Sequence, residues 1–517
     1  MGKKLLVIIF FVVLNSIFAM LPQYSLSYTS EWKTYQWGTK NVNNYNIHIE
    51  KSDENGIYVI DSYTEDSFPG IYKKQEYDKG LYRFSFLVKS DNDSTLLGVH
   101  NGYTECYYFA DKTWQLFSIN FYVPESIGMK KELNIKIKDK GKLWLKKLNI
   151  EKISLPENIS MSKDNQSKCL FFSSINLDYL FDNINDWTDR FSGFLFSNVM
   201  RNWSDNISKK KNKHLFNLLK KVNKECKKRG VSDNYIKVAF YTNLPELSDI
   251  RSWERFLNNF SNCAKFARKT GCRGLAIDTE YIYKQYTLSY SQLQLKQVEN
   301  YGKRLARVMN KNFPNISVII LPNGFFGYGE YWQKFFSGII SGMRECKNKS
   351  GIILFEEKTY SVFNADAIDN IRKVTEIYLK NLLCEEDFAY WKRYCHWAPG
   401  LWPLGYYRAI YNKNNERIGY TGNYGKFMDR LVGSFADKSE RYPKEIFAEL
   451  VSKVSCKYEY FWIYGHGSAW WQLTDNEIQR YKTSTHQLWR QESQKLLPVN
   501  NIDDYYEILE KCRKKSK

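Results

Sequence analysis

The feature that most constrains the fold is an alternation of short apolar runs with amphipathic stretches between residues 169 and 464. The intervening stretches, such as His214 to Lys228 and Gln292 to Asn312, have helical periodicity. Strands that alternate with helices of this length pair in parallel, and eight such units predict a (β/α)₈ barrel over residues 169–500. The eight strand-like runs are Cys169 to Ser173, Gly193 to Val199, Ile236 to Thr242, Gly274 to Glu280, Ser317 to Asn323, Gly351 to Glu357, about Gly400 to Tyr407, and Tyr458 to Tyr464.

An open doubly wound sheet is the alternative to the barrel. That fold favours a glycine-rich turn after its first strand. Here the first strand runs into Ser173-Ser-Ile-Asn-Leu-Asp178, which contains no glycine. The barrel is therefore the preferred interpretation.

Residues 29–153 have a different pattern, with short β-rich runs separated by Asp, Asn, Gly and Ser turns. Examples are Gly80 to Val88, Trp114 to Val123 and Leu133 to Ile137. This pattern predicts an all-β domain. Residues 154–168 are polar and aperiodic and are interpreted as a linker, and residues 501–517 as a C-terminal helix with a basic tail.

The N-terminus has the features of a secretory signal peptide. Two lysines precede an apolar run from Leu5 to Leu14, and a small residue follows at Ala19. The run is shorter than the roughly 20 residues that span a bilayer. We expect residues 1–19 to be removed, giving a secreted, extracellular or periplasmic chain with no integral membrane span. Retention as an anchor is the alternative.

Charge and composition narrow the partners. The chain carries 76 Lys and Arg against 56 Asp and Glu, and loss of Lys3 and Lys4 with the signal lowers the net charge from +20 to +18. The lysines are scattered and form no basic-aromatic nucleic-acid motif, so no nucleic acid is expected. An acidic polysaccharide stays open as a partner. The oligomeric state is not predicted.

Cysteine and histidine patterns argue against a metal site. The ten Cys show no CxxC spacing, and the six His form no HxH or HxxxH pair. No metal and no cofactor is expected. An exported chain permits one or two disulfides, whereas Cys169, in a strand pattern, is expected to be a buried thiol.

Two carboxylates end the fourth strand of the predicted barrel, Gly274-Leu-Ala-Ile-Asp-Thr-Glu280. Side chains alternate along a strand, so Asp278 and Glu280 share the face of Ala276 and point into the barrel at its C-terminal end. Barrel enzymes keep their catalytic groups at that end. An ion pair or a helix cap is the alternative role for these acids.

The sixth strand also ends in acids, Glu356 and Glu357, which face opposite ways. Glu357 is preferred as the inward acid because Tyr360 follows it and could orient a carboxylate. Glu356 is kept as its fallback, with a loop cap or a neighbouring cation as its other roles.

Further polar and aromatic residues follow the other strands. The fifth strand ends in the amide of Asn323, and the eighth places Tyr464 and His466 on one face, although a plain loop role for His466 is equally consistent. The candidate substrate-binding residues are Asn323, Tyr360, Tyr464, His466, Trp470, Trp471, Trp203 and Trp402. Of the adjacent Trp470 and Trp471, one is expected to stack on a sugar and the other to pack beneath the loop.

Two resemblances extend this interpretation. The run from Gly141 through Trp144 to Ile153 resembles the closing strands of jelly-roll carbohydrate-binding modules, although a sandwich that binds nothing is the alternative. The candidate platform aromatics, any of which could be core instead, are Trp32, Trp37, Tyr103, Tyr107 and Tyr108. The whole chain resembles a secreted (β/α)₈ glycoside hydrolase with an N-terminal jelly-roll module, without a match to one family.

The resemblance implies a two-carboxylate mechanism on a poly- or oligosaccharide. We expect Glu280 to be the general acid, with its pKa raised by Asp278, and Glu357 to be the nucleophile or base. The reverse assignment makes Asp278 the nucleophile. The seventh strand carries no acid. Acids on strands four and six resemble the arrangement of α-galactosidase-type barrels, in which both acids are Asp. Because Glu357 is not Asp, this resemblance concerns architecture only. A non-catalytic glycan-binding protein and a polysaccharide lyase are the alternatives; a GxSxG esterase motif is absent.

Overall fold

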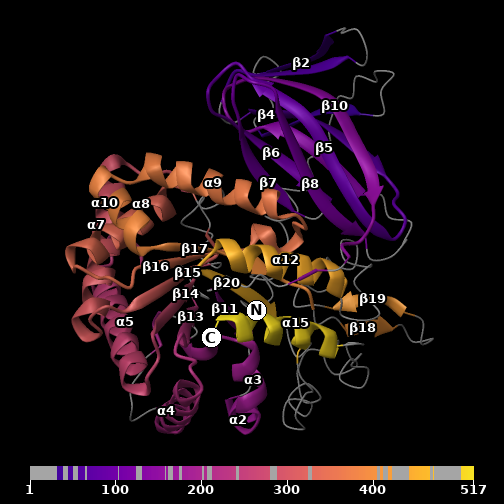
Figure 1. The fold of residues 1–517 in the computed structure, drawn as a ribbon. Coiled ribbons are helices and arrows are strands. Elements are labelled where there is room, and N and C mark those ends of the chain that lie inside the picture. Colours follow the sequence, from indigo (N-terminus) through magenta and orange to yellow (C-terminus); the bar gives the residue numbers. More distant parts are fainter. Residues whose placement is uncertain are drawn as a thin grey trace. The chain divides into compact units, whose positions relative to one another are not determined.

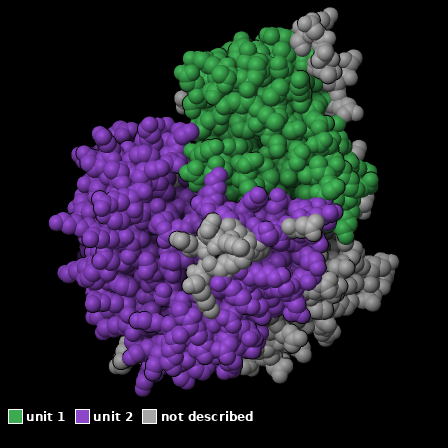
Figure 2. Space-filling model, viewed as in Figure 1, with its two compact units in different colours: residues 1–154, 362–374 green, residues 155–361, 375–517 purple. Residues whose placement is uncertain are grey.

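The structure is a computed structural model. It describes residues 32–516 except 39–44, 51–55, 65–66, 103, 124–130, 158, 161–166, 174–176, 201–202, 206–211, 240–243, 280–287, 324–328, 405–407, 412–416, 422–441, 466–469 and 471–501. The chain forms two compact units (Figure 2). Unit 1 comprises residues 1–154 and 362–374, and unit 2 comprises residues 155–361 and 375–517.

Unit 1 contains a β-sandwich of two five-stranded antiparallel sheets, with strand orders β1-β4-β9-β6-β7 and β2-β3-β10-β5-β8 (Figure 1). The strands are β1 (Lys33–Gly38), β2 (Tyr45–Glu50), β3 (Ile57–Ser62), β4 (Ser67–Gln75), β5 (Gly80–Ser90), β6 (Thr95–Asn101), β7 (Glu105–Ala110), β8 (Gln115–Val123), β9 (Lys131–Ile137) and β10 (Gly141–Ile153). The predicted all-β domain is confirmed.

The sandwich forms because its strands alternate in burial. In β5, Phe84, Phe86 and Val88 are buried while the residues between them are more exposed, as expected for a strand with one face in a core. Three of the predicted platform aromatics are buried. Trp32 stacks on Phe84 at a centroid distance of 5.5 Å, and Tyr107 and Tyr108 are also buried. The side chain of Trp37 and all of Tyr103 lie outside the described residues.

One partly buried ion-pair cluster crosses the first sheet. The Glu105 carboxylate on β7 pairs with Lys136 on β9 and lies 3.8 Å from Lys138, and it accepts a hydrogen bond from Tyr107 at 2.8 Å. Gly98 on the intervening strand β6 permits this, because a Cβ there would meet Glu105 Oε1 at 2.7 Å. Burial opposes ionisation, but the two lysines overcome it and lower the pKa of Glu105 to about 2.

Unit 2 contains a closed parallel barrel of eight strands, which confirms the predicted (β/α)₈ fold. Its strands are β11 (Lys168–Ser173), β12 (Gly193–Met200), β13 (Tyr235–Ala239), β14 (Gly274–Asp278), β15 (Ser317–Leu321), β16 (Ile352–Glu356), β17 (His396–Leu401) and β20 (Tyr460–Gly465). Every residue of β14, β15 and β16 is buried, because the barrel core covers one face and the helices the other. A short hairpin, β18 (Arg408–Tyr411) and β19 (Arg417–Thr421), follows β17.

The helices lie outside the barrel strands (Figure 1). They are α2 (Leu177–Asp182), α3 (Ile184–Arg190), α4 (Lys213–Lys228), α5 (Ile250–Thr270), α7 (Gln292–Asn312), α8 (Gly329–Glu345), α9 (Ala365–Leu382), α10 (Glu385–Tyr394), α12 (Lys444–Lys457) and α15 (Ile502–Ser516), with a 3₁₀ turn η2 (Lys358–Ser361). Local signals set their ends. Ser291 and Gln294 form a capping box at α7, and Gly271, at φ 85°, ends α5 in the left-handed conformation. None of the helices in the described part of the chain is long and apolar enough to cross a membrane.

Two expectations were wrong. The seventh barrel strand spans His396–Leu401, not residues 400–407. It contains Pro399, which pairs with Glu356 of β16 in the register and which weakens the strand signal in sequence. No disulfide joins any two of the ten cysteines. Cys169 is a buried thiol, as expected, and burial raises its pKa well above the usual value.

Candidate active site

The barrel interior is an apolar layer whose membership fixes which way each strand faces. Its members include Tyr235 of β13, Ala276 of β14, Leu321 of β15, Phe355 of β16 and Trp462 of β20. Because side chains alternate along a strand, the residues two positions after Tyr235 and Ala276, still within their strands, face the same way at the C-terminal end of the barrel. Lys237 and Asp278 occupy two such positions.

Lys237 and Asp278 form a buried ion pair between neighbouring strands. Lys237 Nζ lies 2.8 Å from Asp278 Oδ2, and the side chains are 13% and 3% exposed. The ammonium group also lies 4.6 Å from the ring centroid of Phe172 on β11. The pair fits the register, in which Lys237 is opposite Ala276 and Asp278 is opposite Ala239. The predicted acid therefore stands at the C-terminal end of β14 with a lysine partner that was not predicted.

The ion pair changes the electrostatic expectation for strand four. The negative charge of Asp278 was expected to act on Glu280, but the ammonium of Lys237 offsets much of that charge at short range. Thr279 is also buried and donates its backbone N–H to Leu321 O at 2.8 Å, so pairing with β15 continues one residue beyond β14. Glu280 itself lies outside the described residues.

The two acids at the end of β16 differ in their surroundings. Glu356 follows the inward Phe355 and so faces the helix layer, where it is 2% exposed. Its carboxylate accepts hydrogen bonds from the Asn323 amide and, at 3.0 Å, from the backbone N–H of Lys358. Burial raises the pKa of Glu356, although Lys358 and Asn323 oppose the shift. Glu356 therefore acts as a cap for this loop, one of the roles expected for it.

Glu357 is the first residue after β16 and is partly exposed. Its carbonyl accepts the backbone N–H of Tyr360 at 3.1 Å, within the 3₁₀ turn η2. The turn thus holds the backbone of Tyr360 against that of Glu357. Asn323, which was expected to bind substrate, is 2% exposed and donates to Glu356 and, at 3.4 Å, to Thr375. Its amide is engaged on the helix side of the barrel.

Three of the predicted aromatics form one cluster with the interior layer. Tyr360 lies 5.6 Å from Tyr464, stacked, and 5.5 Å from Trp402. Trp402 lies 5.0 Å from Tyr464, and Tyr360 lies 5.3 Å from Trp462. Trp402 is buried, whereas Tyr360 and Tyr464 are partly exposed. These two tyrosines are the members of the cluster whose rings reach the surface.

The remaining predicted aromatics are placed elsewhere. Trp470 is fully buried and packs against Phe171 and Phe191 at 6.0 and 6.5 Å, so it is a core residue that cannot stack on a sugar. Trp203 packs on Phe256 of α5 at 6.2 Å, in the helix layer. His466 and Trp471 lie outside the described residues.

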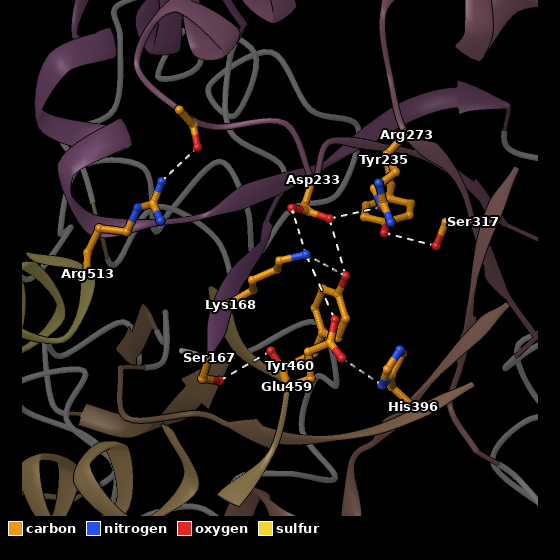
Figure 3. Close-up of polar contacts among 11 residues, drawn as sticks. Ser167, Lys168, Asp233, Tyr235, Arg273, Ser317, His396, Glu459, Tyr460 and Arg513 are labelled. Carbon is orange, nitrogen blue, oxygen red and sulfur yellow. Dashed lines mark hydrogen bonds and ion pairs between the residues drawn. The ribbon is translucent and has the colours of Figure 1, made fainter. Parts of the chain in front are cut away.

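The opposite, N-terminal end of the barrel carries a polar network that the sequence did not suggest (Figure 3). The buried Asp233 carboxylate lies 3.0 Å from Arg273 Nε and 3.6 Å from Lys168 Nζ, and it accepts a hydrogen bond from Tyr460 at 3.4 Å. His396 Nδ1 lies 3.3 Å from Glu459, but burial is the larger effect and lowers the pKa of the imidazole. Groups at this end of a barrel serve stability.

Comparisons with known proteins return structures only. No protein-family model and no curated protein matches the chain. A chitinase from Bacteroides thetaiotaomicron is 13% identical with a TM-score of 0.34 and covers 58% of this chain and 89% of its own. The carbohydrate-binding and catalytic modules of xylanase 10B from Clostridium thermocellum, solved with xylohexaose, are 11% identical with a TM-score of 0.28, over 92% of this chain and 95% of that chain.

Xylanase 10C from Cellvibrio japonicus, solved with xylopentaose, is 8% identical with a TM-score of 0.33 and covers 94% of this chain and 98% of its own. These identities are below 25% and these TM-scores are below 0.5. The residues at the C-terminal end of the barrel are therefore the evidence for function.

Proposed function

We propose that this chain is an exported glycoside hydrolase that cleaves a poly- or oligosaccharide with two carboxylates. The observation that carries the proposal is the pair of acidic strand ends at the C-terminal end of a closed barrel. Asp278 is buried at the end of β14, and Glu357 is partly exposed after β16. The partly exposed rings of Tyr360 and Tyr464 supply apolar surface of the kind that packs on a pyranose.

In this proposal Glu280 is the general acid and Glu357 is the nucleophile or base. Glu280 follows Asp278 by two residues, and strand alternation assigns both to the inward face. The Asp278 carboxylate, paired with Lys237, is suited to act either as an electrostatic partner of Glu280 or, in the competing assignment, as the nucleophile. Glu356 has no direct role, because its carboxylate faces the helix layer.

The test is a polysaccharide and aryl-glycoside panel with the mature protein and its variants. Glu280→Gln should lower turnover by orders of magnitude on glycans with poor leaving groups and much less on aryl glycosides, which barely need protonation. Near-normal turnover of natural glycan by both Glu280→Gln and Asp278→Asn would show that strand four does not carry the chemistry.

A further inference from the structure

The outer face of the second sandwich sheet carries tryptophans and lysines in alternation. On β10, Leu143 and Leu145 are fully buried in the core, so Lys142, Trp144 and Lys146 face outward. Trp144 is opposite Lys89 of β5 in the register. Trp114, just before β8, completes the set. These five residues are called the Trp–Lys face.

Lysine ammonium groups lie against both indoles. Lys89 Nζ lies 5.2 Å from the ring centroid of Trp114 and 4.9 Å from that of Trp144. Lys146 lies 4.0 Å from Trp114, and Lys142 lies 5.6 Å from Trp144. The two rings and three ammonium groups therefore form one continuous strip across β10 and β5. Both rings are partly exposed, in contrast to the buried Trp32, Tyr107 and Tyr108.

The charge of the face is only partly balanced. Lys142 pairs with Asp61 at 3.2 Å. Among the residues that the structure describes, no carboxylate lies within ion-pair distance of Lys89 or Lys146. Leu116 of the neighbouring strand β8 is paired with Leu87 of β5 and is 70% exposed. It extends the apolar surface beside Lys89 and Lys146. A ligand that matches this face combines apolar ring surface with regularly spaced negative charge.

We propose that the Trp–Lys face binds a polysaccharide of uronic acids with free carboxylates. The pyranose rings supply C–H faces for Trp114 and Trp144, and each carboxylate approaches a lysine ammonium. A register shift between Lys146 and Asn149, with Lys147 at φ 54°, marks a β-bulge that ends the regular part of the strip. The choice of a glycan over a single-stranded nucleic acid, which also suits aromatic and basic surfaces, rests on the proposed function of the barrel.

The experiment is affinity electrophoresis of the full chain in gels that contain polygalacturonate or its fully methyl-esterified form. The two polymers share a backbone and differ in carboxylate charge, so only the charged one should retard the protein. Retardation should weaken steeply between about 0.1 and 1 M salt, because the Debye length falls from about 10 to 3 Å. Equal retardation by the methyl ester would overturn the charged class of ligand.

Variants locate the site. Trp114→Ala with Trp144→Ala, and Lys89→Gln with Lys146→Gln, should each weaken binding about tenfold or more, which corresponds to about 1.4 kcal/mol. Lys33→Gln with Lys79→Gln makes the same change in net charge at exposed positions away from the face and should leave binding unchanged. Loss of binding in that control would indicate net charge instead of a site. Retained binding in both test variants would overturn the Trp–Lys face as the site.

Two further arms separate the outcomes. Tighter retention of oligo-thymidylate than of polygalacturonate would overturn the glycan assignment in favour of nucleic acid. Binding is measured in the Glu357→Gln background as well, so that turnover does not consume the polymer. Specific retardation of a chain that has no hydrolytic activity would refute the proposed function but support the Trp–Lys face as a binding site. Hydrolysis of glycan without retardation would support the proposed function but refute the Trp–Lys face as a binding site.

Discussion

Replacing Lys237 by Met tests the central pair of the barrel. Methionine keeps an apolar chain over Phe172 but removes the ammonium that lies 2.8 Å from Asp278. The Asp278 side chain is only 3% exposed, so its carboxylate would lose its charge partner in a desolvated position. Removing one partner of a buried pair costs about 3–5 kcal/mol of unfolding free energy, because the other charge stays buried.

The size of the effect on melting follows from the size of unit 2, which contains about 350 residues. At about 2.1 cal/mol/K of unfolding entropy per residue, a loss of 3–5 kcal/mol lowers the melting temperature by about 4–7 °C. Scanning calorimetry measures this shift. The double variant Lys237→Met with Asp278→Leu should recover most of it, because a well-packed apolar pair replaces a buried ion pair at little or no cost.

The pH dependence of activity provides a second readout. Without the ammonium of Lys237, the charge of Asp278 should act more strongly on Glu280 and raise the pKa of that proposed general acid. A general acid must hold its proton, so the alkaline limb of kcat/KM should move to higher pH. An unchanged melting temperature in Lys237→Met would refute the stability argument. An unchanged alkaline limb with a lowered melting temperature would show that the pair does not act on the catalytic acid.

Three further outcomes distinguish the roles of other acids. Glu357→Gln should lower kcat at least a thousandfold on glycans. Glu356→Gln should change kcat less than about tenfold, because the Glu356 side chain faces the helix layer, and equal losses in the two variants would contradict that placement. Asp233→Asn should lower the melting temperature, because Arg273 and Lys168 lose the carboxylate that pairs with both, but leave KM unchanged, as measured in parallel thermal and kinetic assays. Glu105→Gln should lose about 3 kcal/mol of stability at neutral pH, from a pKa lowered from 4.5 to about 2. A lowered carboxyl pKa stabilises above pH 4.5, so the difference from wild type should fade between pH 4.5 and 2 in acid-unfolding curves, and persistence at pH 2 would contradict it.

The barrel could be predicted because parallel strands covered on both faces appear as continuous apolar runs, and seven of the eight runs overlap an observed strand over most of their length, whereas the seventh shares only Gly400 and Leu401 with β17. The exception shows the limit of that signal. In β17 the sequence His396-Trp-Ala-Pro-Gly-Leu401 contains a proline and a glycine, which weaken a strand pattern without preventing the register with β16. Local composition alone cannot reveal pairing of that kind.

The residues of the candidate sites were predicted less completely than the strands. Alternation shows which side chains share a face of one strand, but not what covers that face. Tyr235-Ile-Lys-Val-Ala239 already contains a lysine on the face of its tyrosine, so alternation was enough to place Lys237 inside the barrel. In the sandwich, parity alone does not say which face of a strand is covered. Trp144 shares its strand with the buried Leu143 and Leu145, and only the pairing of two sheets makes it an outer residue. Disulfides likewise depend on distances that the fold sets.

The two ends of the barrel carry buried charges for different physical reasons. At the N-terminal end, Asp233 meets both Arg273 and Lys168, and the tyrosine and serine around them satisfy further polar groups, which is a closed arrangement suited to stability. At the C-terminal end, Lys237 stands against the ring of Phe172, and its partner Asp278 comes two residues before Glu280 in the chain. Because an apolar pair would fill that position at comparable stability, the ion pair is best explained by the carboxylate that it places beside the proposed catalytic acid.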